Sequence, residues 1–269
     1  MIKSIRQSLL NSWYMCPEAV RRRYFLGDVM PPGIAAKIGT GVHEGAEVNH
    51  LAKIVTGKDE PLDVIQDAAR DAYIRSIENY GIFFPIEERS TANIQMSEGV
   101  DITTDLAGVY HKSLAPLIMP EFVEKRFEMD VDGIDLPFTG TIDLLTTDNW
   151  LADLKTAARK WPQSKADNSI QCTIYREAVK RETGKPPDKM SFEVFTKTKK
   201  REHHSIVTTR TDEDFEFVVS RAKLMLQSIK AGIFQPCDPD SWNCNPKWCG
   251  YYWTCPHIPA HKKILPKGA

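Results

Sequence analysis

The sequence predicts an α/β protein in which helices flank a mixed β-sheet. Three short apolar segments joined by turns lie between residues 122 and 156, as is typical of adjacent strands. A second pair of alternating segments follows at 190–198 and 204–209. Helical patterning precedes, separates and follows these strands, and this order fits one sheet packed against helices.

The composition excludes a strongly basic nucleic-acid-binding protein. Of 269 residues, 42% are hydrophobic and 26% are charged, and 35 basic against 36 acidic residues leave a net charge of −1. Any binding of nucleic acid would therefore depend on local basic patches. There is no apolar run of membrane-spanning length and no apolar segment after Met1, so we expect no membrane span, no secretory signal and a cytoplasmic location.

The N-terminal part of the chain is expected to be helical. Residues 4–25 form the first helical segment, with Ser4 as its cap and an interruption at Cys16-Pro17. A second helix opens near Ile38 and runs to about Thr56. Residues 58–120 have helical patterning without any chemical motif, and we interpret them as a helical insertion.

The three central strands are expected at 122–131, 136–147 and 150–156. Asp132-Gly133 and Asp148-Asn149 are the turn signals between them.

Further helices frame the second pair of strands. One begins at Ser164 or Asp167 and ends near Glu182, and a final helix opens at Thr211 and stops near Gly232. We therefore expect a single domain built from 1–57, the helical insertion 58–120, a core at 121–234 and a cysteine-rich tail at 235–269.

Two aspartates and a lysine lie within the apolar strands. Asp153 and Lys155 are two positions apart and so point to the same face of one strand, while Asp143 lies on the strand before it. Phosphodiester hydrolysis needs a divalent cation, which carboxylates bind, and a group that stabilises developing charge. These residues therefore predict a metal-dependent phosphodiesterase site, and the alternative is a solvated sheet face. Gly140 would leave room for a close approach of backbone or substrate.

Four of the six cysteines cluster near the C-terminus: Cys237, Cys244, Cys249 and Cys255. In a cytosolic chain this clustering favours a metal or iron–sulfur site over disulfides. From spacing alone, a structural zinc ion held by these four is the default interpretation. Cys172 lies inside a predicted helix and is expected to be a small buried hydrophobe.

Positive charge is concentrated in short runs. Arg159-Lys160 leaves the strand of Asp153 directly and is the best placed to contact phosphate. Trp161 beside it would either stack on an unpaired base or be buried. No motif for reading bases is present. The other positive positions are Arg21–Arg23, which also fits a solvated helix face, Lys165, and Lys197–Arg201.

Several segments together resemble the PD-(D/E)xK nuclease superfamily, and most closely its RecB-like exonuclease branch. Gly140-Thr-Ile-Asp143 and Asp153-Leu-Lys155-Thr156 resemble the core motifs. Gly39-Thr-Gly-Val-His43 resembles the first motif of the branch, and Gln171-Cys-Thr-Ile-Tyr175 resembles its Gln-x-x-x-Tyr helix. The resemblance implies a restriction-endonuclease-like core. One departure is Asp153, where many relatives have Glu.

The resemblance also implies roles for individual residues. Mg²⁺ or Mn²⁺ would be bound by His43, Asp143, Asp153 and the backbone carbonyl of Leu154. Glu124 would lie near the metals, although Glu121 is close enough in sequence to take its place. The implied catalytic set is Lys155, Asp143, Asp153, Glu124, Gln171 and Tyr175. Of these, Gln171 and Tyr175 would lie beside the site and contact DNA.

Some RecB-like nucleases, including AddB-type and CRISPR-associated exonucleases, have one cysteine before the nuclease core and three after it, and these hold a [4Fe–4S] cluster. Cys16, Cys244, Cys249 and Cys255 resemble this set, although four residues separate Cys244 from Cys249 where two are commoner. The resemblance implies a structural cluster that ties the chain ends together. Zinc, or Cys237 as a ligand, is the alternative.

The function implied by the resemblance is that of a metal-dependent DNA exonuclease. It would act on single-stranded ends, with 5′ to 3′ polarity favoured, in recombination, replication or repair in a phage or a prokaryotic cell. Its partner would be DNA, joined by a second copy of the chain or by recombination or CRISPR proteins. The alternatives are a non-catalytic DNA-binding or scaffold module of the same fold and a structure-specific endonuclease.

Overall fold

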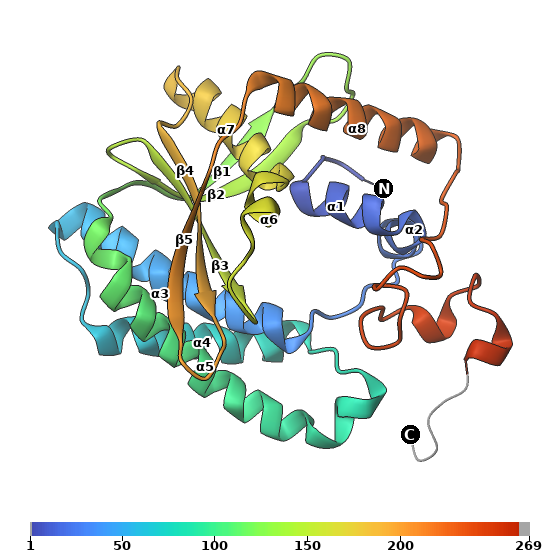
Figure 1. The fold of residues 1–269 in the computed structure, drawn as a ribbon, viewed down its shortest axis with the longest axis horizontal. Coiled ribbons are helices and arrows are strands. Elements are labelled where there is room, and N and C mark those ends of the chain that lie inside the picture. The colour runs from blue at the N-terminus through green and yellow to red at the C-terminus, as the bar shows by residue number, and fades with distance from the viewer. Residues whose placement is uncertain (1, 264–269) are drawn as a thin grey trace.

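The computed structural model describes residues 2–263 and has a five-stranded sheet at its centre (Figure 1). The strands lie in the sheet in the order of the chain: β1 (Pro120–Met129), β2 (Phe138–Thr146), β3 (Trp150–Ala157), β4 (Lys189–Thr196) and β5 (Glu202–Thr208). β3 and β4 pair in parallel, and the other neighbours pair antiparallel. The predicted α/β fold with a mixed sheet is confirmed.

Helices from both ends of the chain cover one face of the sheet (Figure 1). They are α1 (Gln7–Met15), α2 (Pro17–Tyr24), α6 (Gln163–Asp167), α7 (Ile170–Thr183) and α8 (Asp212–Lys230). One core cluster joins Leu9 of α1 to Ile142 of β2, Ile174 of α7 and Val218 of α8. Packing against this cluster holds the first helix beside the sheet.

Two long helices cover the opposite face, α3 (Ile34–Thr56) and α5 (Ala92–Ser113), and α4 (Leu62–Tyr80) packs against both of them. A 3-10 helix at Ile86–Thr91 follows α4, and another at Ala115–Leu117 follows α5. The helical patterning predicted for 58–120 is confirmed. The helices α3 and α4 approach closely at Gly41, where an added Cβ would lie 2.6 Å from the Ala69 carbonyl oxygen. A second core cluster joins these helices to Leu144 of β2 and Leu154 of β3.

The first helix begins later than predicted, because the residues before it pair with the sheet. The Ile5 N–H donates to the Pro137 carbonyl (2.8 Å), and the Thr139 N–H donates to the Ile5 carbonyl (2.9 Å). Ser4 does not cap a helix, because its hydroxyl accepts a hydrogen bond from the Thr139 hydroxyl. The interruption at Cys16 occurs as predicted, with extended backbone at that residue.

The helix predicted from Ser164 or Asp167 to Glu182 is two helices, α6 and α7. At their junction the buried guanidinium of Arg210 donates to the Ala166 carbonyl within α6 and to the Ser169 carbonyl just before α7. By contrast, Thr211 opens α8 as predicted, with its hydroxyl and the Asp214 carboxylate forming a reciprocal capping box.

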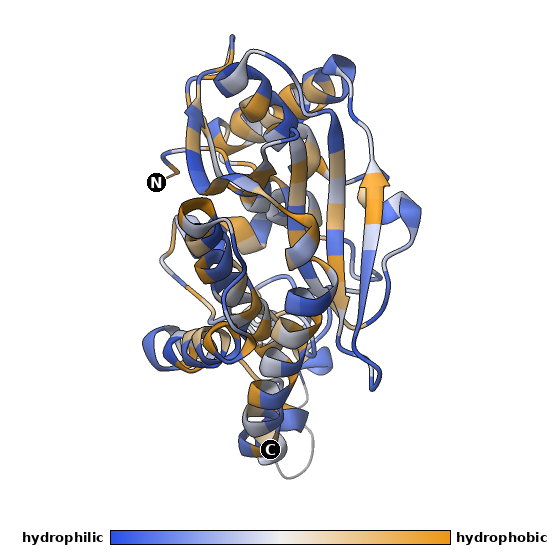
Figure 2. Cartoon of the chain, turned by 90° about the vertical axis from the view of Figure 1, so that its left-hand side faces the viewer, coloured by the Kyte–Doolittle hydropathy of each residue, from blue (hydrophilic) through white to orange (hydrophobic). Residues whose placement is uncertain are grey.

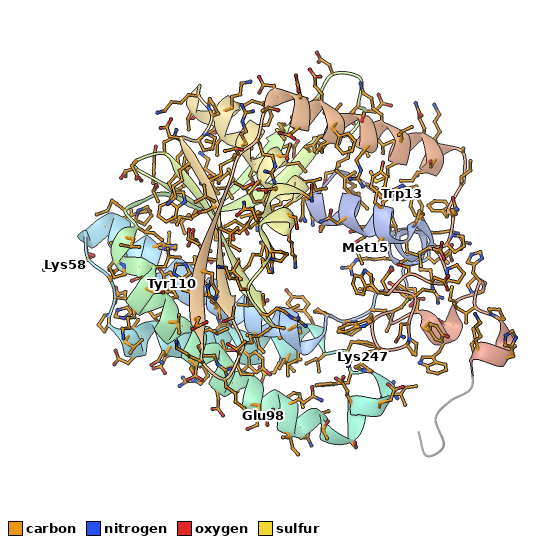
Figure 3. All side chains as sticks on the ribbon, viewed as in Figure 1. Trp13, Met15, Lys58, Glu98, Tyr110 and Lys247 are labelled. Carbon is orange, nitrogen blue, oxygen red and sulfur yellow. The ribbon has the colours of Figure 1, made fainter. Side chains whose placement is uncertain are left out.

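The cysteine-rich tail packs against the N-terminal helices and the helical segment. Tyr251 donates to the Asp28 carbonyl (2.7 Å), and Arg22 donates to the Thr254 hydroxyl (2.8 Å). Lys247 reaches the 3-10 turn before α5, where its Nζ lies 3.7 Å from Glu88 Oε1 (Figure 3). Within the described residues the tail has two 3-10 turns, η3 (Tyr252–Thr254) and η4 (Ala260–Lys262). Its predicted end, residues 264–269, lies outside the described residues.

Hydrophobic residues make up long stretches of the strands, whereas the connection between β4 and β5 is hydrophilic (Figure 2). β3 is buried along Trp150–Leu154, as expected for a strand covered on both faces. None of the described helices is long and apolar enough to cross a membrane.

Candidate active site

The two aspartates meet where β2 and β3 separate. Pairing between these strands is limited to Leu144 with Ala152 and Leu145 with Leu151. The next positions in this register, Asp143 and Asp153, face each other beyond the last backbone pair. Asp143 Oδ2 instead accepts a hydrogen bond from the Leu154 N–H (3.2 Å). The two carboxylates therefore lie in a fork between strands and not on a solvated sheet face.

His43 approaches this fork from α3. Its Nε2 lies 2.9 Å from the Leu154 carbonyl oxygen, which can only accept, so Nε2 carries the proton. The lone pair of Nδ1 then faces Asp143 Oδ2 at 3.5 Å and Glu124 Oε1 at 3.9 Å. An imidazole whose second nitrogen donates to a carbonyl is oriented as metal-binding histidines are.

His43, Glu124 and Asp143 each offer one ligand atom, and these atoms lie within 4.8 Å of one another. Burial opposes a charge on His43, but the Asp143 and Glu124 carboxylates outweigh it and raise the pKa of His43. A proton on this imidazole and a bound cation would offset the same negative charge, so the group could hold a divalent metal ion.

Glu124 reaches the group through an unusual backbone conformation. It lies opposite Asp143 in the β1–β2 register, between the pairs of Val123 with Leu144 and Lys125 with Ile142. Its φ is 45°, in the left-handed region that residues other than glycine rarely adopt. Backbone strain of this kind clusters at active sites and ligand-binding sites. Glu121, the alternative from sequence, is exposed and is not part of the group.

Asp153 is buried and lies outside that three-residue group. Its Oδ1 accepts a hydrogen bond from Gln171 Nε2 (2.6 Å). Its Oδ2 forms an ion pair with the Lys155 ammonium. Burial and the nearby Asp143 carboxylate raise the pKa of Asp153 to about 7, although Lys155 opposes this shift.

Lys155 is held as a cation. Burial disfavours its charge, but Asp153 and Asp143 outweigh burial and raise its pKa. An ammonium with a raised pKa can stabilise negative charge but is a poor base at neutral pH.

Tyr175 forms a wall of the site and is not exposed to solvent. Its ring packs edge-on against Phe127, with 5.6 Å between centroids, and burial raises its pKa. The two rings fill the space at Gly140, where an added Cβ would lie 2.7 Å from Phe127 and 3.2 Å from Tyr175. The aromatic rings occupy the side of Gly140 where a Cβ would lie, whereas Gly140 also lines a groove of about 860 Å³, so the expectation that it leaves room for substrate stays a prediction.

Two residues beside the metal group were missed from sequence. Glu47 and His50 line a cavity of about 10 Å³ together with His43, Glu124 and Asp143. His50 Nε2 is buried without a hydrogen-bond partner, and burial and Lys53 lower the pKa of His50 to about 3. The spacing i, i+4, i+7 from His43 places all three side chains on one helix face, and this was the available signal.

Five cysteines gather at one cavity of about 400 Å³ between the first two helices and the tail. Burial, together with the neighbouring thiols of Cys16 and Cys244, raises the pKa of Cys237 to about 12. The five are Cys16, Cys237, Cys244, Cys249 and Cys255. Cys172 is separate and buried in the core, as predicted for a small hydrophobe.

Most of the basic runs named from sequence are engaged within the protein. Arg21 pairs with Glu18, Arg22 with Asp28, and Arg201 with Asp105, while Lys200 pairs with Glu202 and the Lys165 ammonium lies 4.0 Å from the Trp161 ring centroid. Trp161 is half-buried, with its ring centroid 5.2 Å from that of Phe192, so burial and stacking on a base both stay predictions. Arg159 and Lys160 are exposed.

Fold and site together define an α/β protein with an acidic centre that could hold a metal ion and a lysine at a fork between strands. The chain belongs to the PD-(D/E)XK nuclease superfamily, whose family model matches residues 7–256. Membership implies a nuclease that uses divalent metal ions and has DNA as its substrate.

Solved structures that are similar to this chain include the following two. A candidate exonuclease from Eubacterium rectale matches with a TM-score of 0.57 at 12% identity, covering 90% of this chain and 87% of that one. The structure of SSO0001 covers 96% of this chain and 97% of its own at 14% identity, with a TM-score of 0.36. No curated protein matches the chain. At these identities the first structure supports the fold alone, and the second carries no argument.

Proposed function

We propose that this chain is a metal-dependent DNA exonuclease of the RecB-like branch. It acts on single-stranded ends, with 5′ to 3′ polarity favoured, in recombination, replication or repair. The observation that carries the proposal is the fork between β2 and β3, where Asp143 and Asp153 face each other beside Lys155. His43 and Glu124 complete the acidic side of this fork.

The residues fit Mg²⁺ or Mn²⁺. Both ions prefer carboxylate oxygen, and the fork brings together two carboxylates, where burial and then the Asp143 charge raise the pKa of Asp153. We propose His43, Asp143, Asp153 and the Leu154 carbonyl as ligands, with Glu124 beside them. When bound, such a cation would offset negative charge on the phosphate and lower the pKa of a bound water molecule.

The remaining roles belong to the chain's own side chains. The Lys155 ammonium donates a hydrogen bond to the phosphate oxygen on which negative charge develops. Gln171 holds the Asp153 carboxylate in place through its 2.6 Å hydrogen bond. Tyr175 excludes water from one side of the fork as a neutral phenol. Its contact with Phe127 supports this placement.

The test is an end-labelled nuclease assay with Mn²⁺. Linear single-stranded DNA labelled at the 5′ or the 3′ end reports polarity, duplex DNA reports strand preference, and circular single-stranded DNA reports internal cleavage. The Lys155→Ala variant should lose cleavage by more than about 100-fold and keep DNA binding. The matched control is Lys58→Ala, a lysine on the exposed turn after α3 (Figure 3).

Three results would change the assignment. Cleavage that survives Lys155→Ala would remove that residue from the site. Cleavage of circular DNA would favour the structure-specific endonuclease. Binding without any cleavage by the wild type would favour the non-catalytic module.

We also propose a structural [4Fe–4S] cluster held by Cys16, Cys244, Cys249 and Cys255. The shared cavity of these cysteines supports this assignment. Cys237 borders the same cavity beside Cys16 and Cys244, so Cys237 as a ligand, or zinc as the metal, stays the alternative. Anaerobically purified protein should be brown and absorb near about 400 nm through thiolate-to-iron charge transfer, and colourless protein with one zinc per chain would reverse the assignment.

A further inference from the structure

A groove of about 860 Å³ opens onto the candidate active site from the edge of the sheet formed by β1 and β2. Asp143 and Tyr175 belong to its lining, so whatever fills the groove lies beside the fork. The other walls come from the N-terminal segment at 3–8 and from both strands. Three cations lie on these walls: Lys3, Arg6 and Arg126.

These three cations are exposed, and none has an ion-pair partner within the described residues. They differ in this from Arg21, Arg22 and others of the sequence runs, whose charges are neutralised inside the protein. These three cations, from separate parts of the chain, outnumber the two carboxylates of the same lining, Glu128 and Asp143, so the groove is locally positive on a protein of net charge −1.

The N-terminal wall of the groove is fixed in position. Ile5 is fully buried, and it exchanges backbone hydrogen bonds with Pro137 and Thr139 beside the start of β2. Because side chains alternate along an extended segment, burying Ile5 turns its neighbour Arg6 outward. The Arg6 guanidinium is therefore held on a rigid wall and not on a free terminus.

We propose that this groove binds the phosphate backbone of a single DNA strand and leads it to Asp143, with Lys3, Arg6 and Arg126 contacting phosphates. This inference rests on the proposed nuclease function. Arginine binds phosphate through two parallel N–H donors, and the hydroxyl of Thr141 on the same walls adds a donor suited to phosphate or sugar.

A single strand fits better than a duplex. Asp143 is 13% exposed at its side chain and Tyr175 is 8% exposed, so a phosphodiester must enter the groove to reach them. A flexible strand can bend into such a groove, whereas a duplex is stiff over many times this length. Ring faces beside the path, such as Phe127, can also stack on unpaired bases.

The test measures the salt dependence of DNA binding. Fluorescence anisotropy with a labelled single strand is followed from about 50 to 200 mM salt, in the Lys155→Ala background so that the DNA stays intact. Each lost phosphate contact lowers the slope of log K against log salt by about 0.7. The double variant Arg6→Ala/Arg126→Ala should lower the slope by about 1.4 and the affinity at 100 mM salt by about 25-fold.

The matched control removes two cations from a sequence run outside the groove, Lys199→Ala/Lys200→Ala. Its slope should stay within about 0.3 of the parent value. Thermal unfolding of both double variants should match the parent, because all four side chains are exposed.

Each outcome separates this inference from the proposed function. If wild-type protein cleaves DNA and the Arg6/Arg126 variant binds like the control, the groove is wrong and the nuclease stands. If that variant loses binding but wild-type protein never cleaves, the groove stands and the nuclease falls. An equal loss for duplex and single strand would overturn the single-strand preference, and a wild type that binds no DNA would overturn both.

Discussion

Replacing Arg210 by Met tests how the site is supported from outside. The Arg210 guanidinium is 8% exposed and makes five hydrogen bonds: to the carbonyls of Ala166, Ser169 and Thr209 and to the hydroxyls of Thr173 and Thr208. Methionine preserves much of the volume but donates none of these bonds. Because buried acceptors are left without their charged donor, we expect the free energy of unfolding to fall by about 3–5 kcal/mol.

This loss corresponds to a decrease of about 6–20 °C in the thermal midpoint for a chain of this size. The measurement is urea unfolding and calorimetry of Arg210→Met beside Arg159→Met, an exposed arginine that should change stability by less than about 0.5 kcal/mol. Since Ser169 immediately precedes α7, we also expect Gln171 to hold Asp153 less well and kcat to fall more than KM rises. A loss of stability below about 1 kcal/mol would refute the claim that the Arg210 hydrogen bonds stabilise the junction between α6 and α7.

Three further predictions concern the packing, the pH dependence and the cysteines. Gly140→Ala should destabilise the protein by about 1–3 kcal/mol, measured by urea unfolding, because the new Cβ would lie 2.7 Å from Phe127; an unchanged midpoint would show that the ring moves freely. The folded pKa of His50 is lowered to about 3 from 6.5, so the stability contributed by its neutral form is complete above pH 6.5 and is lost as pH falls toward 3. The difference in unfolding free energy between wild type and His50→Gln should therefore shift by about 2 kcal/mol against the wild type between pH 7 and pH 5, and a pH-independent difference would contradict the burial of His50. Cys16→Ser should lose the bound iron while Cys237→Ser keeps it, as measured by metal analysis of each purified variant; the opposite result would make Cys237 a ligand.

Local patterns predicted much of the fold and part of the site. The turns at Asp132-Gly133 and Asp148-Asn149 occur where they were predicted, with positive φ at Gly133 and Asn149. The common face of Asp153 and Lys155 follows from strand alternation, and their ion pair agrees with it. Helical spacing predicted α3, although it starts at Ile34 and not near Ile38, and it predicted helix within 58–120 without the bounds of α4 and α5.

By itself, then, the sequence determined the helical or strand periodicity of each segment, the order of the strands along the chain and the reactive side chains on each strand. Only the tertiary structure decided which groups meet. It ends the β2–β3 pairing one position before Asp143 and Asp153, turns Glu124 toward His43 through a left-handed backbone, and adds Glu47 and His50. The same holds for charge: the runs visible in the sequence are mostly paired inside the protein, while Lys3, Arg6 and Arg126 gather at one groove. The physical reason is that periodicity depends on neighbours along the chain, whereas pairing, burial and electrostatic fields depend on neighbours in space.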